Sequence, residues 1–369
     1  MCFVCFVIKY VFMVKTKIMT RDSAKRIGLA SVLALALTVL GAGGDEPSWL
    51  LSNGHIQMRI EAQGAIISDL RQVEDAESWL APKEAEESVE PFAHFLCFDR
   101  WGPVTAAEEA AGQSFHGEAA RIPWALSAPS SSQTLELRTV LPRAGFAAER
   151  TINLFPDRGS FEIRTRVRNP MEISRPFNLV EHITLADRWN DPSVRLVTNG
   201  HQGLLHEKGQ WMRDAEVAWP YVTEGGVRWD LRDPPPRRGR FIVSLRFPPE
   251  AEWAWVCLQD PRSGMLLSYV WRTEQMPWFN LFWFSNGERT VRRAIEPGTS
   301  GLHRPMSELL QTPIVRDRPV VHWLAAGAQR DFAVRGGMAQ PRNGFGLLTA
   351  LRHEDGGWIA IDDRGQTQL

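Results

Sequence analysis

The sequence predicts an all-β protein built as a large antiparallel sandwich. Turn-forming stretches such as Pro156-Asp157-Arg158-Gly159 and Ser285-Asn286-Gly287 punctuate the chain. Between such turns, apolar and polar residues alternate with a period of two in four clear runs, at residues 56–62, 135–141, 161–167 and 241–247. Many strands that each bury one face need a second sheet to cover them, which favours a sandwich.

The first 42 residues have the pattern of a targeting segment. After Met19 the chain carries Arg21, Lys25 and Arg26, then an apolar run at 27–40 and small residues at 41–44. A basic region, an apolar region and small residues form the layout of a secretory signal, and this apolar run is short for a membrane span. We therefore expect Met19 to be the true start. We also expect cleavage near 41–44 and a secreted or periplasmic protein without a stable membrane span; an N-terminal membrane anchor is the alternative.

The rest of the chain is predicted to form one domain over residues 49–336. Residues 73–90 are acidic and broken by Pro82, which indicates a decorated loop or a short helix. Residues 322–324 and 332–334 predict a closing pair of strands, and the Gly- and Arg-rich residues 337–369 predict a peripheral extension. No linker tract divides the domain, and no period of tens of residues repeats.

The composition argues against nucleic acid and zinc. Removal of residues 1–42 lowers the totals of 42 basic and 43 acidic residues to 36 and 42, a net charge of −6. The one strongly basic stretch left, 236–240, follows two prolines and fits a solvated loop, so no nucleic-acid partner is expected. Cys97 and Cys257 lie in apolar runs, which favours two core thiols over the disulfide that export would permit. No Cys/His spacing is typical of zinc, and the oligomeric state stays open.

Three short motifs carry groups that can move protons near neutral pH. His116 lies in Phe115-His116-Gly117-Glu118, His182 follows Asn178-Leu179-Val180-Glu181, and Glu296 precedes Pro297-Gly298. Two histidines and a carboxylate suffice for proton transfer on a polar substrate. Each residue also fits a structural role: a loop histidine, a hydrogen-bonded core histidine and a surface carboxylate.

Taken in this order, and after an opening hairpin that ends in Gly64-Ala65-Ile66-Ile67, the motifs resemble the galactose mutarotase-like (aldose 1-epimerase) superfamily over roughly residues 53–334. The resemblance implies a β-supersandwich with a sugar cleft on one concave face, a sugar or carbohydrate polymer as partner, and no metal or other cofactor. It also implies that Glu296 takes the anomeric proton, that His182 protonates the ring oxygen, and that His116 and Arg100 hold the sugar.

The chemistry of ring opening sets its own requirements. A pyranose hemiacetal opens when a base takes the 1-hydroxyl proton while an acid protonates the ring oxygen, and closure reverses the two roles. A buried Glu with a raised pKa and a His suit this task. We therefore expect Glu296 and His182 to face one another across a sugar-sized gap, with His116 and Arg100 on the same face.

Other side chains are candidates for supporting roles. Trp278 is expected to line the cleft, because Pro277 interrupts its strand and Trp faces stack on sugars. Arg100 matches the family's sugar-binding Arg only loosely, and a surface pair with Asp99 is its alternative. Three further acidic residues could assist: Glu118, Glu181 and Glu274.

The sequence also departs from the family pattern. Ile183-Thr184-Leu185 replaces an aromatic-rich segment, and Gly298-Thr299-Ser300-Gly301 replaces the Pro-Asp and Asn that usually follow the late Glu. An exported aldose 1-epimerase-like enzyme is the favoured interpretation, and a non-catalytic carbohydrate-binding protein of the same fold is the alternative. A polysaccharide lyase or glycoside hydrolase is less favoured, because a paired-carboxylate hydrolase needs a second acid facing Glu296.

Overall fold

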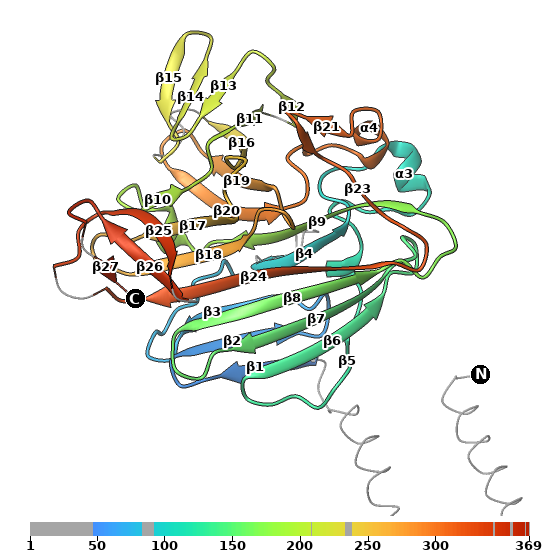
Figure 1. The fold of residues 1–369 in the computed structure, drawn as a ribbon, viewed down its shortest axis with the longest axis horizontal. Helices are drawn as coiled ribbons and strands as arrows, with labels where there is room; N and C mark the ends of the chain where they lie inside the picture. The colour runs from blue at the N-terminus through green and yellow to red at the C-terminus, as the bar shows by residue number, and fades with distance from the viewer. Residues whose placement is uncertain are drawn as a thin grey trace, which may run out of the picture. The chain divides into compact units, whose positions relative to one another are not determined.

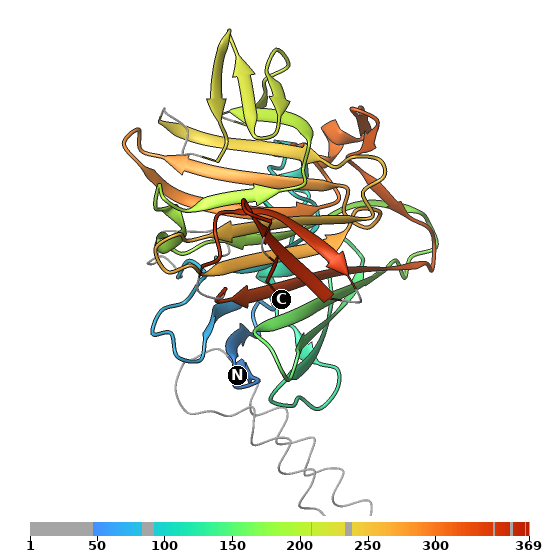
Figure 2. The same ribbon diagram turned by 60° about the vertical axis from the view of Figure 1, so that its left-hand side comes forward.

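Antiparallel strands dominate the chain in the computed structural model (Figures 1 and 2). The structure describes residues 47–82, 92–207, 209–232, 238–341, 344–354, 357–365 and 367–368, which belong to one unit spanning residues 46–369. The expected signal segment, 1–42, lies outside the described residues. Of the acidic stretch 73–90, residues 73–82 form turns and one isolated bridge from Leu80 to Leu185, and the rest lies outside the described residues.

Within the described residues, the larger sheet has 14 strands in the order β1-β2-β3-β4-β9-β20-β19-β16-β11-β13-β14-β15, with β12 beside β11 and β23 beside β9. The strands are β1 (Ser48–Ser52), β2 (Ile56–Glu61), β3 (Ile67–Gln72), β4 (His94–Asp99), β9 (Arg175–Thr184), β11 (Gln202–Glu207), β12 (Gln210–Trp211), β13 (Glu216–Ala218), β14 (Tyr221–Glu224), β15 (Val227–Asp230), β16 (Gly239–Arg246), β19 (Trp278–Ser285), β20 (Thr290–Gly298) and β23 (His322–Leu324). The neighbours β4, β9 and β20 come from distant parts of the sequence and meet near the middle of this sheet.

The smaller sheet has eight strands among the described residues, in the order β10-β17-β18-β24-β8-β7-β6-β5. They are β5 (Ala125–Leu126), β6 (Thr134–Val140), β7 (Ala147–Leu154), β8 (Ser160–Arg168), β10 (Arg195–Thr198), β17 (Trp253–Gln259), β18 (Leu266–Arg272) and β24 (Gln329–Ala339). All four alternating runs picked out in the sequence are strands of these two sheets, so the predicted all-β fold is confirmed.

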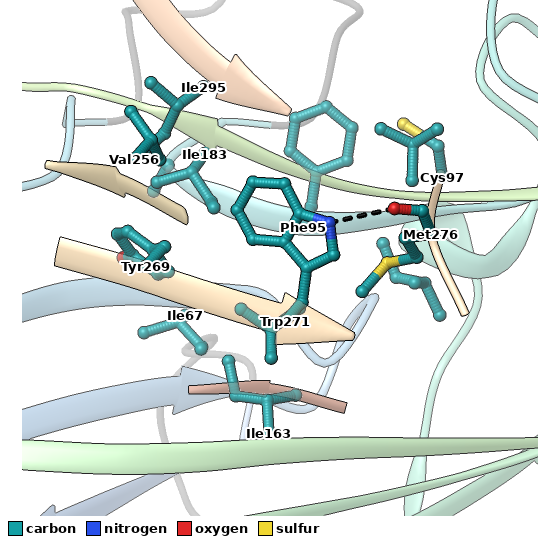
Figure 3. Packing of buried hydrophobic residues seen from close by; sticks show 14 of the residues in the cluster. Ile67, Phe95, Cys97, Ile163, Ile183, Val256, Tyr269, Trp271, Met276 and Ile295 are labelled. Carbon is teal, nitrogen blue, oxygen red and sulfur yellow. Dashed lines mark hydrogen bonds between the residues drawn. The ribbon is translucent and has the colours of Figure 1, made fainter. Parts of the chain in front are cut away.

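The two sheets share one apolar core. Ile183 and Ile295 from the larger sheet and Ile163, Tyr269 and Trp271 from the smaller sheet gather in it (Figure 3). All five side chains are buried, and burying an aliphatic side chain of this size contributes about 1.5–3 kcal/mol. The indole N–H of Trp271 donates to the carbonyl of Met276 at 2.9 Å, so the large ring is buried with its polar atom satisfied.

A polar cluster crosses this core. Arg150 on β7 donates from its two terminal nitrogens to the carboxylate of Glu181 on β9, at 3.0 and 2.8 Å, and His94 on β4 contacts the same carboxylate at 3.0 Å. Burial by itself raises the pKa of Glu181, but Arg150 and His94 outweigh it and lower the pKa to about 2. Glu181 therefore stays ionised and ties the two sheets together. It faces the core, away from His182, the next residue on the strand.

The predicted closing pair of strands is wrong. Residues 322–324 do form β23, but β23 pairs with β9, whereas residues 332–334 belong to β24, which pairs with β8 and β18. The two segments join different sheets, because Ala325 to Ala328 carry the chain from one layer to the other. The two cysteines among the described residues, Cys97 on β4 and Cys257 on β17, are buried and free, as expected for core thiols.

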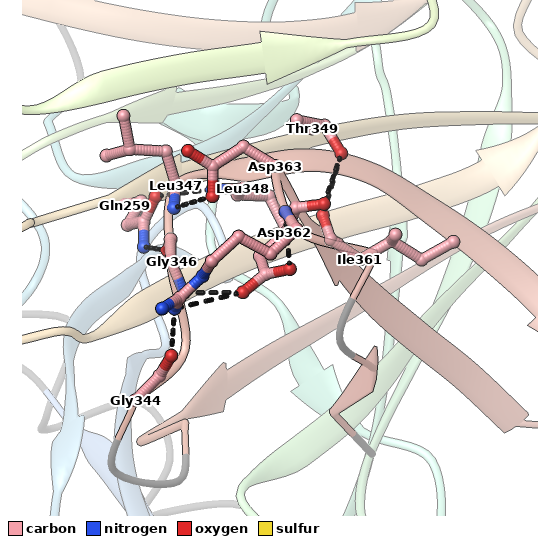
Figure 4. Close-up of polar contacts among 10 residues, drawn as sticks. Gln259, Gly344, Gly346, Leu347, Leu348, Thr349, Ile361, Asp362 and Asp363 are labelled. Carbon is pink, nitrogen blue, oxygen red and sulfur yellow. Dashed lines mark hydrogen bonds and ion pairs between the residues drawn. The ribbon is translucent and has the colours of Figure 1, made fainter.

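The C-terminal residues add a small sheet of three strands among the described residues: β25 (Leu348–Glu354), β26 (Gly357–Asp362) and β27 (Thr367–Gln368). Gln259 on β17 anchors it, donating to the carbonyl of Gly346 at 2.8 Å and accepting from the N–H of Leu348 at 2.7 Å (Figure 4). The carboxylate of Asp362 accepts from the N–H of Gly346 at 2.6 Å and closes the turn.

Short helices and one hairpin complete the described chain. They are α3 (Ala106–Ala110), α4 (Met306–Leu309), the 3-10 turns η1 (Ala119–Arg121) and η2 (Asp187–Asn190), and the hairpin β21 (Ile314–Val315) and β22 (Arg318–Pro319). Thr105 and Glu108 form a capping box that starts α3, and the carboxylate of Glu108 also accepts from the N–H of Ser307 at 2.9 Å. This contact fastens α3 to α4.

Candidate functional site

A cavity of about 450 Å³ lies on the face of the larger sheet that points away from the core. Cavities of roughly 300–1,000 Å³ are typical of small-molecule sites. Strand side chains alternate between the two faces, so only every second residue of β9, β20, β19 and β16 reaches the cavity. The register of these strands arranges the lining side chains in three rows.

The first row carries the acid–base groups. Ile295 on β20 pairs with Ile183 on β9, so the next positions, Glu296 and His182, lie opposite one another on the cavity face. His182 Nε2 is 3.3 Å from Glu296 Oε1. The two groups are therefore in direct contact, so the prediction of a sugar-sized gap between them is wrong. Directly opposed strand residues have Cβ atoms only about 4.5–5.5 Å apart, which leaves no room for a ring.

Glu296 is buried, with 2% of its surface exposed. Burial raises its pKa to about 8, although the indole N–H of Trp101, donating to Oε2 at 2.7 Å, acts in the opposite direction by favouring the carboxylate. A carboxyl group that keeps its proton near neutrality is characteristic of acid–base sites. The sequence predicted the residue, but not its Trp101 partner.

His182 lies between Glu296 and an aromatic ring. Phe95, its partner on β4, stacks on the imidazole with centroids 4.5 Å apart and an angle of 17°. Burial and, to a smaller extent, nearby His94 together lower the pKa of His182 to about 3. The contact with Glu296 thus has the geometry of an ion pair, yet burial opposes charge on both partners. We describe it as a neutral carboxyl–imidazole pair that holds one exchangeable proton.

His116 reaches the same cavity from a turn. Its backbone has φ +63°, a left-handed conformation that is uncommon outside glycine, and Gly117 follows with φ +77°. A Cβ on Gly117 would collide with the carbonyl oxygen of Phe98, so only glycine allows the turn to approach β4 this closely. His116 Nδ1 accepts from the N–H of Gly102 at 3.2 Å, which leaves the proton on Nε2 as a donor. Its ring centroid is 5.5 Å from that of His182.

Two histidines of the site were missed in the sequence. His303 lies 5.6 Å from His116 and 4.9 Å from Trp101, ring centroid to ring centroid, and the Nε2–H of His206 donates to the carbonyl of Gly301 at 3.1 Å. Burial lowers the pKa of His303 to about 3 and that of His206 to about 4, so both are neutral near pH 7. His303 lies in a loop without periodicity, so no local pattern could have marked it.

Two of the expected sugar contacts are wrong. Arg100 does not line the cavity, because its guanidinium is held by Asp99 at 3.1 Å and Glu108 at 3.5 Å. Trp278 is on the correct face of β19, but the chain after Gly301 covers it. Its ring is fully buried in a cluster with Leu302, Met306, Leu309, Val315, Val320 and Val321, and its N–H donates to the carbonyl of Pro319 at 2.8 Å.

The other acidic candidates also lie elsewhere. Glu118 accepts from the backbone N–H groups of Arg143 and Ala144, at 3.0 and 2.8 Å, and so holds a turn of the smaller sheet. Glu274 does not line the cavity. Among the described residues that line it, Glu296 is the one carboxylate.

The second and third rows extend the cavity along the sheet. In the second row, Phe282 on β19 lies beside Ile242 on β16 and gives an apolar floor. In the third row, Phe284 lies between Arg292 on β20 and Arg240 on β16. The basic stretch 236–240 was expected to be a solvated loop; residues 233–237 lie outside the described residues, but Arg240 belongs to β16 and lines the cavity.

No group of three His, Cys, Asp or Glu side chains in the described part of the chain is arranged to hold a metal ion. Likewise, no helix among the described residues is long and apolar enough to cross a membrane.

Comparison with protein-family models finds no match, and comparison with curated proteins finds none either. Solved structures do match. A galactose mutarotase related enzyme from Lactobacillus acidophilus superposes with a TM-score of 0.58 at 11% identity, over 79% of this chain and 97% of that chain. A protein from Escherichia coli K12 described as a candidate aldose 1-epimerase gives 0.58 at 14% identity, over 80% and 99% of the two chains.

A third structure, a candidate aldose 1-epimerase from Klebsiella pneumoniae, gives a TM-score of 0.57 at 16% identity, over 81% of this chain and 82% of that chain. The chain therefore has the galactose mutarotase-like fold that the order of its motifs predicted. At identities this low the likeness shows the fold alone. The roles of the site residues rest on their own geometry.

Proposed function

We propose that this chain is an aldose 1-epimerase-like enzyme that binds a reducing sugar and interconverts its anomers. The observation that carries the proposal is the neutral pair of Glu296 and His182, which lies in a sugar-sized cavity with His116 beside it. A protonated carboxyl beside a neutral imidazole is equivalent, by transfer of one proton, to a carboxylate beside an imidazolium. The second form supplies a base and an acid together, as ring opening requires.

The proposed reaction uses both groups in one step. The carboxylate of Glu296 takes the proton of the 1-hydroxyl, and the O–H electron pair forms the carbonyl at C1. The bond from C1 to the ring oxygen breaks, and the ring oxygen takes its proton from Nε2 of His182. Rotation about the C1–C2 bond and the reverse transfers then close the ring as the other anomer.

The neighbouring side chains would hold the sugar above this pair. His116 presents an Nε2–H donor towards the cavity, and Phe282 offers a half-buried aromatic face for the C–H groups of the ring. Asn280 on β19 is the cross-strand partner of Glu296, and Phe282 lies two residues further along the same strand. A sugar ring could therefore contact Phe282 and Glu296 at once. Neither side chain needs to ionise for these roles.

The described lining gives less support to the other interpretations. A paired-carboxylate glycosidase needs two acids about 5–10 Å apart, and the described lining residues include Glu296 alone. A binding protein without turnover would have no need of a buried carboxyl with a pKa of about 8 in contact with a histidine.

Polarimetry on freshly dissolved α-anomers of several aldoses tests the proposal. The wild-type protein should speed the approach to the equilibrium rotation for at least one sugar, after subtraction of the spontaneous rate. Binding of sugars without any acceleration, in the full panel, would favour the non-catalytic binding protein.

We also propose that residues 1–42 direct export. The support is the order of basic, apolar and small residues after Met19. N-terminal sequencing of protein from the secreted or periplasmic fraction should give a first residue near 41–44. An intact Met1 or Met19 on protein that stays in the cytoplasm would contradict it, and an intact start on membrane-bound protein would support the anchor instead.

A further inference from the structure

Thr184 lines the cavity, and the proposed reaction gives it no role. It is the last residue of β9, two positions after His182, so both side chains lie on the cavity face of the strand. Thr184 also belongs to Ile183-Thr184-Leu185, a segment in which the sequence departs from the family pattern. Its hydroxyl oxygen, Oγ1, is 3.3 Å from Nδ1 of His182. Thr184 thus places a polar atom beside the second ring nitrogen of the proposed acid.

The fold holds this hydroxyl in place. The backbone N–H of Thr184 donates to the carbonyl of Ala93 at 2.8 Å, and its carbonyl accepts from the N–H of Ala81 at 3.0 Å. The side chain is buried, and a β-branched side chain has few rotamers available. The imidazole of His182 is fixed as well, because Phe95 stacks on its face. The contact between the two side chains therefore has a defined geometry.

The hydrogen bonds around Glu296 set the direction of this contact. The indole N–H of Trp101 can only donate, so Oε2 of Glu296 accepts from it. Near pH 7 Glu296 keeps a proton, because burial raises its pKa to about 8, and this proton belongs on Oε1, which faces Nε2 of His182. When Nε2 accepts from Oε1–H, the single proton of the neutral imidazole is on Nδ1. Nδ1–H then donates to Oγ1 of Thr184.

We propose that Thr184 is a positioning residue: its hydroxyl oxygen accepts the Nδ1–H of His182 and so keeps Nε2 free to receive the proton of Glu296. The hydrogen bond at one ring nitrogen decides which nitrogen of a histidine is protonated. The inference rests on the proposed function, since that function makes His182 the acid. The contact should strengthen when His182 becomes an imidazolium, because a charged donor forms a stronger hydrogen bond. Thr184 would then favour the carboxylate–imidazolium form that opens the sugar ring.

The test combines nitrogen NMR of protein labelled with ¹⁵N-histidine, at pH 6, with polarimetry on the sugar that the wild-type protein turns over fastest. The variants are T184V, which keeps the branched shape without the oxygen, and T184S, which keeps the hydroxyl. T184A replaces T184V if circular dichroism shows that valine disturbs the fold. The signal of His182 is assigned by its absence in H182N. The matched control is T139V, because Thr139 is a strand residue outside the cavity whose hydroxyl also donates, to the carbonyl of Pro123 at 3.0 Å.

In the wild-type protein the His182 signals should show a protonated Nδ1 and an unprotonated Nε2. T184V should show a mixture of the two tautomers. Its kcat should fall about ten- to a hundredfold, the value of one hydrogen bond to a charged group, while KM changes little. T184S should restore the wild-type tautomer and most of kcat, and T139V should match the wild-type protein in both measurements.

Several results would overturn the inference and leave the enzyme proposal standing. They are a wild-type His182 with its proton on Nε2, and a T184V variant with the kcat of the wild-type protein. A lower kcat in T184V with an unchanged tautomer would show a packing role, and a higher KM alone would show a contact with the sugar; either also overturns it. An Nδ1–H tautomer that is lost in T184V, in a protein that accelerates mutarotation of no sugar, supports the positioning contact and contradicts the enzyme proposal.

Discussion

Trp101 donates its indole N–H to Glu296 at 2.7 Å, although 195 positions separate the two residues in the sequence. The bond stabilises the ionised carboxylate against burial, which acts in the opposite direction. It also fixes one carboxylate oxygen, so that the other, Oε1, is left facing His182. Trp101 therefore sets both the orientation and the proton affinity of the proposed base.

The variant W101F should raise the pKa of the Glu296–His182 pair. Phenylalanine keeps most of the apolar volume but cannot donate, so the carboxylate loses a hydrogen bond. The loss is expected to move the alkaline limb of the kcat/KM profile upward by about one pH unit. A profile with the wild-type midpoint and only a lower plateau would instead assign Trp101 a packing role.

The wild-type pH profile follows from the proton shared by the pair. With pKa values of about 8 for Glu296 and about 3 for His182, the singly protonated pair predominates between these limits. Above about pH 8 the pair loses its shared proton, and no acid remains. Near pH 3 the pair gains a second proton, and no base remains. Mutarotation, measured as kcat/KM, should be flat near pH 5–7 and fall above about pH 8. Activity that rises through pH 8 would contradict the shared-proton scheme.

Substitution of the two groups should reveal that they act together. E296Q keeps the shape of the side chain but cannot take the proton, so it should lose about 10²–10⁴-fold in kcat while still binding sugar. H182N should lose a similar factor, and E296Q/H182N should be no slower than either single variant, because one step needs both groups. Full mutarotation by E296Q would remove the base assignment.

The sequence predicted the parts of the site that lie on regular strands. The short motifs around His182 and Glu296 marked both residues, and the order of the motifs predicted the fold. Trp278, predicted to line the cleft, does share a face of β19 with Asn280, Phe282 and Phe284. The sequence could not show that the chain after Gly301 covers that end, which leaves Phe282 and Phe284 as the aromatic residues of β19 that line the cavity.

The site predictions that were wrong or missing share one physical cause, which is contact between segments distant in the sequence. Glu296 and His182 touch because β20 pairs with β9, and no local pattern gives the partner of a strand. Arg100 is held by Glu108, a residue that caps a short helix and also binds α4. His303 reaches the cavity from a loop whose course depends on that packing.

The buried histidines should make the protein sensitive to acid. The pKa values of His182 and His303 are about 3 in the folded protein against 6.5 for a free histidine, so between these limits the unfolded chain binds more protons. Stability should therefore fall as pH drops below about 6.5. Glu296 has the opposite effect, because its pKa is raised in the folded protein. Its contribution to stability is complete below about pH 4.5 and is lost as the pH rises through about 8.

Urea unfolding across pH 4–9 should accordingly give a maximum free energy of unfolding near pH 6.5. In H303N the slope on the acid side should decrease by up to about 1.4 kcal/mol per pH unit, the value for one proton. An unchanged slope would mean that His303 is protonated as readily in the folded protein as in the unfolded chain.

The buried cluster of Arg150, Glu181 and His94 should be the most sensitive polar contact in the core. Removal of one partner leaves a buried charge without compensation, so R150M is expected to cost about 3–5 kcal/mol in urea unfolding. Arg166 on the neighbouring strand β8 offers a matched control, because it also pairs with a carboxylate, Asp331, at 2.8 Å but is half-exposed. R166M should cost far less than R150M, because water screens an ion pair at the surface.

The double variant R150M/E181M separates charge from packing. If the cost of R150M comes from the carboxylate left in the core, replacing Glu181 as well should recover most of it, because apolar side chains of similar volume fill the same space. The cavity lies on the other face of β9, so mutarotation by the folded double variant should remain measurable. Equal costs for R150M and R166M would show that Glu181 gains water or a new partner when Arg150 is lost. The ion pair would then not be what joins the two sheets.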